Sequence, residues 1–316
     1  MKNSFIIILL LGLAPIALHA QATLSVQAIH RQHAFPRTVP AGNYSGITAI
    51  DDSTYAIVDD KSARDGFHLF RINIDTISGD IRHVRQLDFK GNNGPYRDAE
   101  GIVYCPESQT IFISGEHDKR IMEYTLDGQL TGRQLPMPAL FDQARKNGGL
   151  ESLAFCPERH TFYTTTENPL TGDSALTLRI QSFDAQLHPL HQATYRMDAP
   201  EGKKKSRFRA HGVSELTALP DGRLLVLERE LRVPKIKIGA TVTCKIYVFD
   251  EREKTLLCRW QTRLNLTRRS FANYEGMCLG PRLAGGGCVL ILVADSQNQY
   301  GGLLKDRFRT IVIGGL

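Results

Sequence analysis

Two carboxylates bracket a short stretch around residue 100. Glu100 opens the segment Glu-Gly-Ile-Val-Tyr, and Glu116 closes the segment Ile-Phe-Ile-Ser-Gly-Glu. Pro106 and the polar residues after it separate the two segments, which is typical of a turn between strands. Because the start of one antiparallel strand lies beside the end of its neighbour, we expect Glu100 and Glu116 at the same edge of a hairpin.

Related stretches occur five times along the chain. The aligned first-strand positions are Ser45, Glu100, Glu151, Ser214 and Glu275. The ends of the second strands supply Asp59, Asp60, Glu116, Glu167, Glu228, Glu230 and Asp295. If the units surround one axis, most of these carboxylates meet at one end of that axis, which we call the mouth. Since serine replaces glutamate in the first and fourth units, the site is expected nearer the second, third and fifth.

Carboxylates crowded into a narrow mouth repel one another unless protons or cations neutralise them. Clustered oxygen donors suit a hard divalent cation, Ca²⁺ ahead of Mg²⁺, rather than zinc. The predicted metal ligands are Glu100, Glu151, Glu275, Asp59, Glu116, Glu167, Glu228 and Asp295. In the alternative interpretation, the strand-start carboxylates accept hydrogen bonds from backbone N–H groups of the neighbouring unit.

Basic residues follow the second strands, on the face where the carboxylates are expected. The predicted substrate-binding residues are Lys61, Arg64, Lys119, Arg120, Arg229 and Arg232. A basic loop from Lys203 to His211 enters the fourth unit. Such cations hold a phosphate group and spread its charge while a metal orients water. In the alternative interpretation, these loops are basic because they are exposed to solvent, and they bind no substrate.

The candidates for proton transfer are His211, His117 and Glu230. The sequence contains no Gly-x-Ser-x-Gly elbow, no His-Glu-x-x-His pair and no Rossmann fingerprint. A serine esterase therefore has no motif to support it.

The repeated unit shows how the chain would position these groups. Each unit contains a first strand, a turn, a second strand that ends in acid, and a third strand; the first four units add a fourth strand. Successive first strands lie about 50 to 60 residues apart. This pattern predicts an all-β fold, a β-propeller of four-stranded blades, with five blades by repeat count and six as the alternative.

The two ends of the chain complete this ring. The fifth unit stops after its third strand, from Phe308 to Ile313, whereas a spare strand from Leu24 to His30 precedes the first unit. We expect the spare strand to join the last blade, because closure protects sheet edges from pairing with other chains.

The chain begins with Lys2 and an apolar run from Phe5 to Leu18, which is too short to span a membrane. Small residues follow, so we predict a signal peptide over residues 1–20, cleaved after Ala20 or Ala22. The propeller domain would then cover residues 21–316. This predicts an exported protein, periplasmic or secreted, without a membrane anchor.

The net charge of +6 favours anionic partners. No basic stripe is interleaved with aromatic residues, which argues against nucleic acid as the partner. We expect a monomer that takes a small anionic substrate or ligand.

Six cysteines occur, and none forms a Cys-x-x-Cys pair. Cys278 with Cys288, and Cys244 with Cys258, would each meet across a hairpin and form disulfides in an exported chain. Buried free thiols are the equal alternative.

The chain resembles the phytase-like propeller family, whose name describes an esterase-like activity of phytase. The resemblance runs from Ser45 to the C-terminus and is carried by Glu100-Gly101-Ile102, Glu151-Ser152-Leu153-Ala154, Leu224 to Glu230, Lys245-Ile246-Tyr247 and Asn273 to Pro281. It implies an exported bacterial protein that hydrolyses a phosphate ester or another ester.

Together these observations predict an exported phytase-like hydrolase acting on a phosphate ester or ester of a small anionic molecule at a metal-binding mouth. Two alternatives stay open: a non-catalytic propeller that binds a ligand at the same mouth, and a calcium-dependent hydrolase of lactones or sugar acids.

Overall fold

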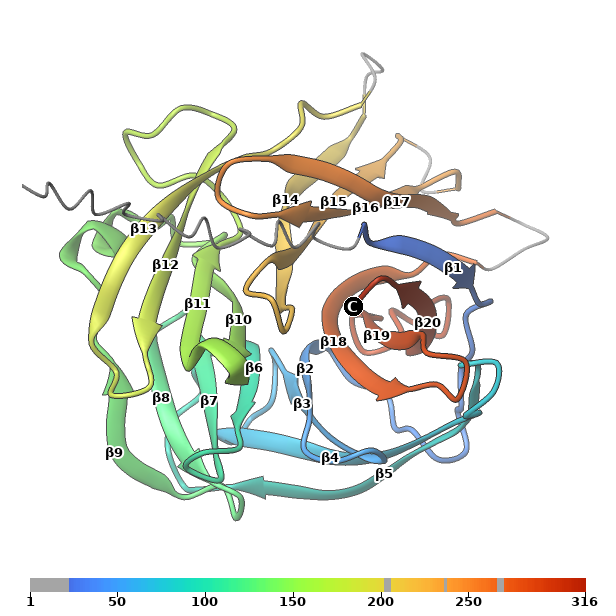
Figure 1. The fold of residues 1–316 in the computed structure, drawn as a ribbon. Coiled ribbons are helices and arrows are strands. Elements are labelled where there is room, and N and C mark those ends of the chain that lie inside the picture. The colour runs from blue at the N-terminus through green and yellow to red at the C-terminus, as the bar shows by residue number, and fades with distance from the viewer. Residues whose placement is uncertain (1–22, 202–205, 236–237, 266–269) are drawn as a thin grey trace, which may run out of the picture.

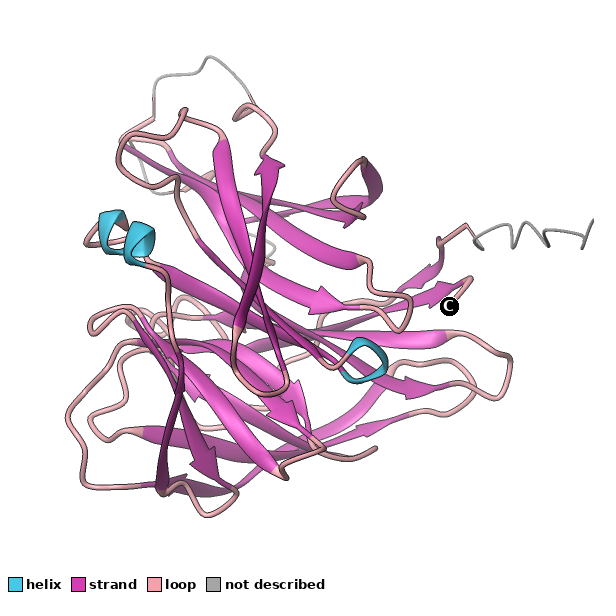
Figure 2. Cartoon of the chain, turned by 60° about the vertical axis from the view of Figure 1, so that its left-hand side comes forward, coloured by secondary structure: helices cyan, strands magenta, loops and turns pink. Residues whose placement is uncertain are grey.

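The computed structural model describes residues 23–201, 206–235, 238–265 and 270–316. The expected signal peptide lies outside these residues. Twenty strands form five antiparallel sheets of four strands each, arranged as blades around one axis (Figure 1). The predicted five-bladed propeller is confirmed, and the six-bladed alternative is wrong. The described helices are two short 3₁₀ turns, Ala139–Gln143 and Pro157–Arg159 (Figure 2).

Four blades follow the chain from the axis outward. Blade 1 contains β2 (Tyr44–Ala49), β3 (Thr54–Asp59), β4 (Gly66–Ile74) and β5 (Ile81–Gly91). Blade 2 contains β6 (Ala99–Cys105), β7 (Thr110–Gly115), β8 (Arg120–Thr125) and β9 (Leu130–Leu135). Blade 3 contains β10 (Leu150–Cys156), β11 (Thr161–Thr166), β12 (Thr177–Asp184) and β13 (Pro189–Arg196). Blade 4 contains β14 (Phe208–Ala218), β15 (Leu224–Val233), β16 (Thr241–Phe249) and β17 (Lys254–Arg263).

Blade 5 combines the two ends of the chain, as predicted. It contains β18 (Asn273–Arg282), β19 (Cys288–Asp295), β20 (Arg307–Gly314) and the N-terminal strand β1 (Ser25–Ile29). β1 pairs antiparallel with β20, and Val26 lies opposite Ile313. The blue and dark red strands therefore lie side by side in Figure 1. This pairing supplies the outer strand that the fifth unit lacks and closes the ring.

Apolar side chains pack between the blades. The rings of Phe112 and Phe162, from blades 2 and 3, lie 4.7 Å apart between centroids. Every residue of β19 is buried because blades cover both of its faces. The six cysteines are free thiols inside this core, so the alternative of buried free cysteines is confirmed and the two suggested disulfides are wrong. Among the described residues, no helix is long and apolar enough to cross a bilayer.

Blade 4 differs from the expected pattern. The basic loop over Lys203 to His211 is predicted to precede the first strand, but β14 already begins at Phe208. Likewise β15 continues to Val233, past the expected end at Glu228. The two strands pair along this extension, with His211 opposite Glu230. Figure 1 shows them projecting beyond the ring.

Candidate functional site

A β-bulge interrupts the inner strand of every blade at the same position. The register shifts lie between Tyr44 and Ile47, Ala99 and Ile102, Leu150 and Ser152, Val213 and Glu215, and Tyr274 and Gly276. A bulge adds an unpaired residue and re-aims its side chain. The residues in these bulges include the five aligned positions, Ser45, Glu100, Glu151, Ser214 and Glu275. The inner strands contact one another around the axis, so the bulges form one mouth.

Glycine follows the bulge residue in blades 1, 2 and 5 because the next blade comes very close. A Cβ atom on Gly276 would lie 2.2 Å from the carbonyl oxygen of Ser45, and one on Gly46 would lie 2.4 Å from that of Glu100. These contacts explain the repeated Glu-Gly pair in the sequence: glutamate faces the mouth, and glycine admits the neighbouring backbone.

Arg229, on the extension of β15, points into the mouth and meets three of its carboxylates. Its Nη1 lies 2.9 Å from Glu275 Oε1, and its Nη2 lies 3.0 Å from Glu167 Oε1 and 3.7 Å from Glu151 Oε1. Burial disfavours the charge of Arg229, but these carboxylates outweigh it and raise its pKa. The structure therefore places Arg229 at the centre of the mouth, whereas the sequence placed it among the outer basic loops.

A second group of carboxylates lies between blades 1 and 2. Oxygen atoms of Asp60, Asp98 and Glu100 lie within 4.8 Å of one another, which is close enough to share one metal ion. Ser45 Oγ donates to Glu100 Oε2 at 2.6 Å. The buried Oδ1 of Asp60 has no hydrogen-bond partner among the described residues. We call Asp60, Asp98 and Glu100 the carboxylate trio.

Lys61 supplies part of the missing positive charge. Its Nζ lies 2.9 Å from Asp60 Oδ2 and 2.7 Å from Asp98 Oδ1. One ammonium cannot balance three carboxylates. Burial raises the pKa of Asp60 to about 6, with Lys61 opposing the rise and Asp59 and Asp98 adding to it. The trio thus favours binding either protons or a further cation.

Burial also raises the pKa of Glu100, Glu151 and Glu275. The pKa of Glu100 lies well above its ordinary value, because Asp60 and Glu275 add to the effect of burial. The pKa of Glu151 is raised in the same way, with Glu100 and Glu167 contributing. For Glu275, burial raises the pKa to about 7 even though Arg229 opposes the rise.

Four further predicted metal ligands have protein partners of their own. Glu116 Oε1 accepts from the backbone N–H groups of Gly148 and Gly149. Asp59 accepts from the backbone of Asn43 and Lys61 at 3.2 and 3.0 Å, and Asp295 accepts from that of Gln297 at 2.6 Å. Glu116 accepts from the backbone that leads into the neighbouring blade, as the alternative interpretation expected of carboxylates at strand starts, although Glu116 follows a strand end. The donors to Asp59 and Asp295 lie in their own blades.

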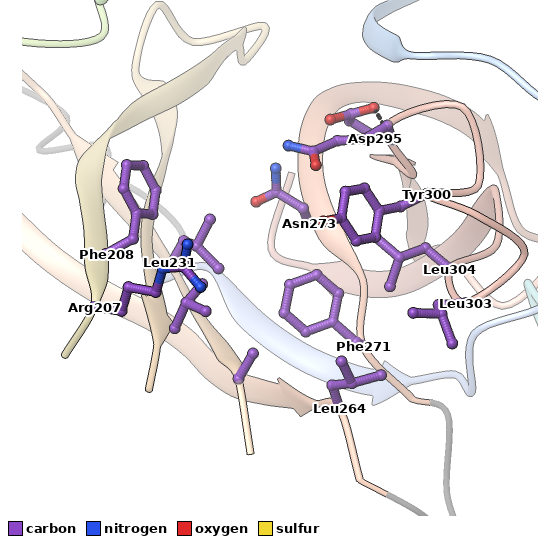
Figure 3. Close-up of a pocket in the computed structure, with 13 residues that line it drawn as sticks. Arg207, Phe208, Leu231, Leu264, Phe271, Asn273, Asp295, Tyr300, Leu303 and Leu304 are labelled. Carbon is purple, nitrogen blue, oxygen red and sulfur yellow. Dashed lines mark hydrogen bonds between the residues drawn. The ribbon is translucent and has the colours of Figure 1, made fainter. Parts of the chain in front are cut away.

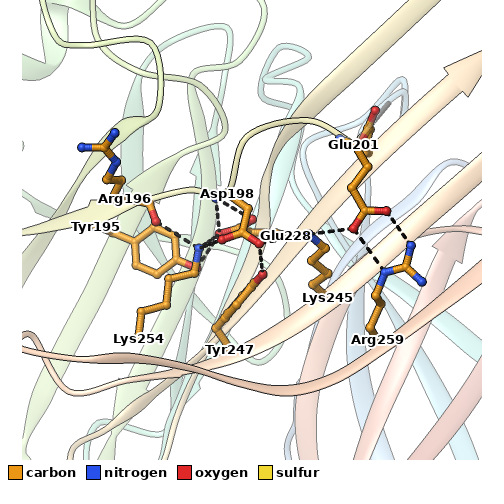
Figure 4. A network of polar contacts seen from close by, with 10 residues as sticks. Tyr195, Arg196, Asp198, Glu201, Glu228, Lys245, Tyr247, Lys254 and Arg259 are labelled. Atoms are coloured by element: carbon orange, nitrogen blue, oxygen red, sulfur yellow. Dashed lines mark hydrogen bonds and ion pairs between the residues drawn. The ribbon is translucent and has the colours of Figure 1, made fainter. Parts of the chain in front are cut away.

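Glu228, the fourth of them, belongs to a polar network between blades 3 and 4. It accepts from Tyr195 Oη at 2.7 Å and from Lys254 Nζ at 2.6 Å (Figure 4). Lys254 also binds Asp198 at 2.9 Å. Lys245 pairs with Asp198 at 3.0 Å and with Glu201 at 2.9 Å, and Arg259 pairs with Glu201 at 2.5 Å. Three cations thus balance three carboxylates in this network, and Glu228 needs no added cation.

The structure distributes the predicted basic residues over several roles. Lys119 Nζ donates to the carbonyl oxygens of Asp142 and Ala144 at 2.9 and 3.1 Å. The guanidinium of Arg64 stacks on Phe89, 4.3 Å from the ring centroid. Arg120 is exposed, and Arg232 is half-buried on β15. Within the part of the chain that the structure describes, Lys61 and Arg229 are the two of these six that form ion pairs with carboxylates of the mouth.

The predicted proton-transfer residues lie around the mouth rather than within the carboxylate groups. Glu230 pairs with Arg209 at 3.3 Å, and burial lowers the pKa of its cross-strand neighbour His211. His117 is exposed, and its ring lies 6.4 Å from that of Tyr96, whose hydroxyl accepts from Lys61 Nζ at 3.4 Å.

Sequence reasoning omitted Asp60 and Asp98 from the metal ligands. Asp98 lies two residues before Glu100, and Asn273 lies two residues before Glu275, where it donates to Glu275 Oε1 at 2.7 Å. Residues two apart share a face only along a regular strand. Asp98 lies before β6 with a φ of 55°, and Glu100 lies in the bulge, so this spacing alone did not bring the two carboxylates together. Asp60 directly follows Asp59 at the end of β3, and that end gave no sign of which carboxylate faces the axis.

A largely apolar pocket of about 320 Å³ adjoins the mouth (Figure 3). Leu231, Phe271 and Leu304 line it, and Asn273 and Asp295 form its polar end. At the other end of the propeller axis, the inner strands of all five blades line a separate space of about 360 Å³.

The comparisons with known proteins point to one family. A family model described as phytase-like, with esterase-like activity of phytase, matches residues 39–297. No curated protein matches the chain. Among solved structures, a streptogramin B lyase is 12% identical, with a TM-score of 0.40 and coverage of 89% of this chain and 97% of the other. A putative oxidoreductase (glucose dehydrogenase) from Thermus thermophilus is 10% identical, with a TM-score of 0.38 and coverage of 90% and 100%.

Proposed function

The chain belongs to this phytase-like family, and we propose that it is an exported, metal-dependent hydrolase that cleaves a phosphate ester or another ester of a small anionic molecule at the mouth of the propeller. The observation that carries the proposal is the carboxylate trio, in which three acidic side chains converge beside one lysine. We further propose that it acts as a monomer, without a membrane anchor or nucleic acid.

The residues of the trio fit a hard divalent cation. They offer only oxygen donors, which Ca²⁺ and Mg²⁺ prefer. The buried Oδ1 of Asp60, with no hydrogen-bond partner among the described residues, is an acceptor that a cation would satisfy. Three carboxylates with one ammonium also leave two negative charges, which matches a divalent ion. Ca²⁺ is the first choice because the site accommodates several carboxylates, with Mg²⁺ second.

A bound cation would supply a Lewis acid that polarises the ester and offsets the negative charge of an anionic substrate. Residues of the chain would accept the proton that the attacking water loses. The pKa of Glu275, about 7, suits a group that accepts a proton from water near neutral pH. Arg229 and Asn273 both donate toward Glu275 Oε1 and hold that carboxylate in place. We therefore assign Glu275 as general base, in place of His211, His117 or Glu230.

The test is an assay of residues 21–316 on three substrates: 4-nitrophenyl phosphate, 4-nitrophenyl acetate and a simple aromatic lactone. Each is measured with Ca²⁺, with Mg²⁺ and with EDTA. We expect hydrolysis of at least one ester, lost with EDTA and reduced at least about a hundredfold by Asp60→Asn. The matched control is Asp127→Asn, because the Asp127 side chain is 87% exposed and its ion pair with Lys90 is long, at 4.0 Å.

Activity on the lactone alone would favour the lactone-hydrolase alternative. Inactivity on all three substrates with either cation would contradict the proposal and favour a binding propeller.

A further inference from the structure

The apolar pocket beside the mouth has two walls from different blades. The extension of β14 and β15 contributes Phe208, Leu231 and Val233. A turn after β19 contributes Tyr300, Leu303 and Leu304, which face the strand extension across the pocket (Figure 3). Phe208, Tyr300 and Leu303 are exposed although apolar or aromatic. Exposed side chains of this kind around a cavity are typical of a ligand site.

The second wall has an unusual backbone. Six successive residues from Gln297 to Gly302 have positive φ angles, between 32° and 77°. The left-handed conformation costs about 1–2 kcal/mol for each residue that is not glycine. Gln299 Nε2 donates to Asp306 Oδ2 at 2.8 Å, and the backbone of Asn298 donates to the carbonyl of Gly42 at 3.1 Å. The protein thus maintains a strained turn that presents Tyr300 to the pocket, and such strain is found mostly at functional positions.

Asn273 connects the pocket to the mouth. It lines the pocket and also accepts from Arg229 Nη1 at 2.9 Å and donates to Glu275 Oε1 at 2.7 Å. Asp295 lines the same end, and the charge of Glu275 adds to burial in raising its pKa. A ligand that fills the pocket therefore ends beside the carboxylates of the mouth.

Resting on the proposed function, we propose that this pocket binds an aromatic or branched alkyl group of the substrate and so selects esters with an apolar group next to the bond that is cleaved. The lining is mostly apolar, and its charged residues are the exposed Arg207 and, at the end beside the mouth, Asp295. Among Leu264, Phe271 and Leu304 a charged group would find no partner, and an unpaired charge is costly to bury. The substrate would then carry its anionic group at the mouth and an apolar group in the pocket.

The experiment measures the binding of 2-naphthol, an uncharged aromatic alcohol, by saturation-transfer NMR and titration calorimetry, with EDTA present. Val233→Trp fills the pocket from the half-buried Val233 on β15. Phe208→Ser removes part of the exposed rim and is the milder variant. Leu190→Trp is the control, since Leu190 is 54% exposed on β13 in another blade.

We expect wild type and Leu190→Trp to bind 2-naphthol equally, Phe208→Ser to bind more weakly, and Val233→Trp to bind at least about tenfold more weakly, since filling a pocket removes its apolar contacts. No binding to wild type, or equal binding by Val233→Trp, would overturn the proposal even if the protein hydrolyses esters. Binding in the pocket without any hydrolysis would support the pocket as a site for an apolar group, and it would contradict the proposed function and with it the selection of esters.

Discussion

Arg229 Nη1 and Glu275 Oε1 lie 2.9 Å apart at the centre of the mouth, and each comes from a different blade. The same guanidinium reaches Glu167 and Glu151. One arginine thus ties blade 4 to blades 3 and 5, and its charge allows three carboxylates, of which Glu151 and Glu275 are buried, to lie together. The trio of Asp60, Asp98 and Glu100 has only Lys61, which is why we place the added cation there.

Replacing Arg229 tests its role in stability. Arg229→Met leaves Glu151, Glu167 and Glu275 without their partner, and breaking a buried ion pair costs about 3–5 kcal/mol. The loss is measured by urea unfolding at pH 8. It should shrink toward pH 5, because the buried carboxylates then take up protons. Arg82→Met is the control. The Arg82 side chain is 67% exposed in its pair with Asp75, so this replacement should leave the free energy of unfolding unchanged. A cost no larger than that of the control would contradict the role of Arg229.

The glycine after the bulge is expected to be irreplaceable. In Gly276→Ala, the new Cβ would lie 2.2 Å from the carbonyl oxygen of Ser45. Separating the blades to relieve this contact should cost at least about 1–3 kcal/mol, the range for overpacked cores. Gly285→Ala is the matched control because its Cβ would meet nothing within 4 Å. Equal melting temperatures for the two variants would show that the inner strands do not pack as closely as described.

Glu215 should make stability depend on pH. Burial raises its pKa well above the ordinary value, although the backbone N–H groups of Leu216 and Leu153 donate to Oε1 at 3.0 and 3.4 Å. The folded protein therefore keeps a proton that the unfolded chain loses at about pH 4.3. The contribution to stability is fully present below that pH and falls as pH rises toward the folded-state pKa, by at most about 1.4 kcal/mol per pH unit.

Glu215→Gln removes this titration while keeping an oxygen that accepts hydrogen bonds. Measured by urea unfolding between pH 4 and pH 8, the variant should gain on wild type as pH rises. A constant difference across that range would mean that Glu215 is ionised in the folded protein.

The cysteines should react only after unfolding. All six are buried free thiols, so a thiol reagent should label none quickly in the native protein and all six in urea. Reducing agent should leave the melting temperature unchanged. Fewer than six labelled thiols in urea, without a reductant, would reveal a disulfide.

The fold was largely predictable because the repeat is local. Each hairpin forms from consecutive residues. The alignment of the five units identified the positions that lie in the bulges, which are Ser45, Glu100, Glu151, Ser214 and Glu275. The closure by β1 followed from counting strands.

The site was less predictable because its contacts join different blades. Glu228, Arg229 and Glu230 read as the end of a strand and the start of a charged loop, yet all three continue β15 and are buried. Their burial depends on partners such as Glu275 and Lys254, which lie far away in sequence. Local composition cannot identify such pairs. It also cannot show that Asp60 lies near Asp98, because the two residues belong to different blades.

The most direct test of the central claim is calorimetric titration of Ca²⁺ and Mg²⁺ into metal-free residues 21–316. We predict binding of one ion per chain, abolished in the double variant Asp60→Asn with Asp98→Asn and retained in Asp127→Asn. The absence of binding by either ion, or equal binding by the double variant, would contradict the assignment of the trio as the cation site.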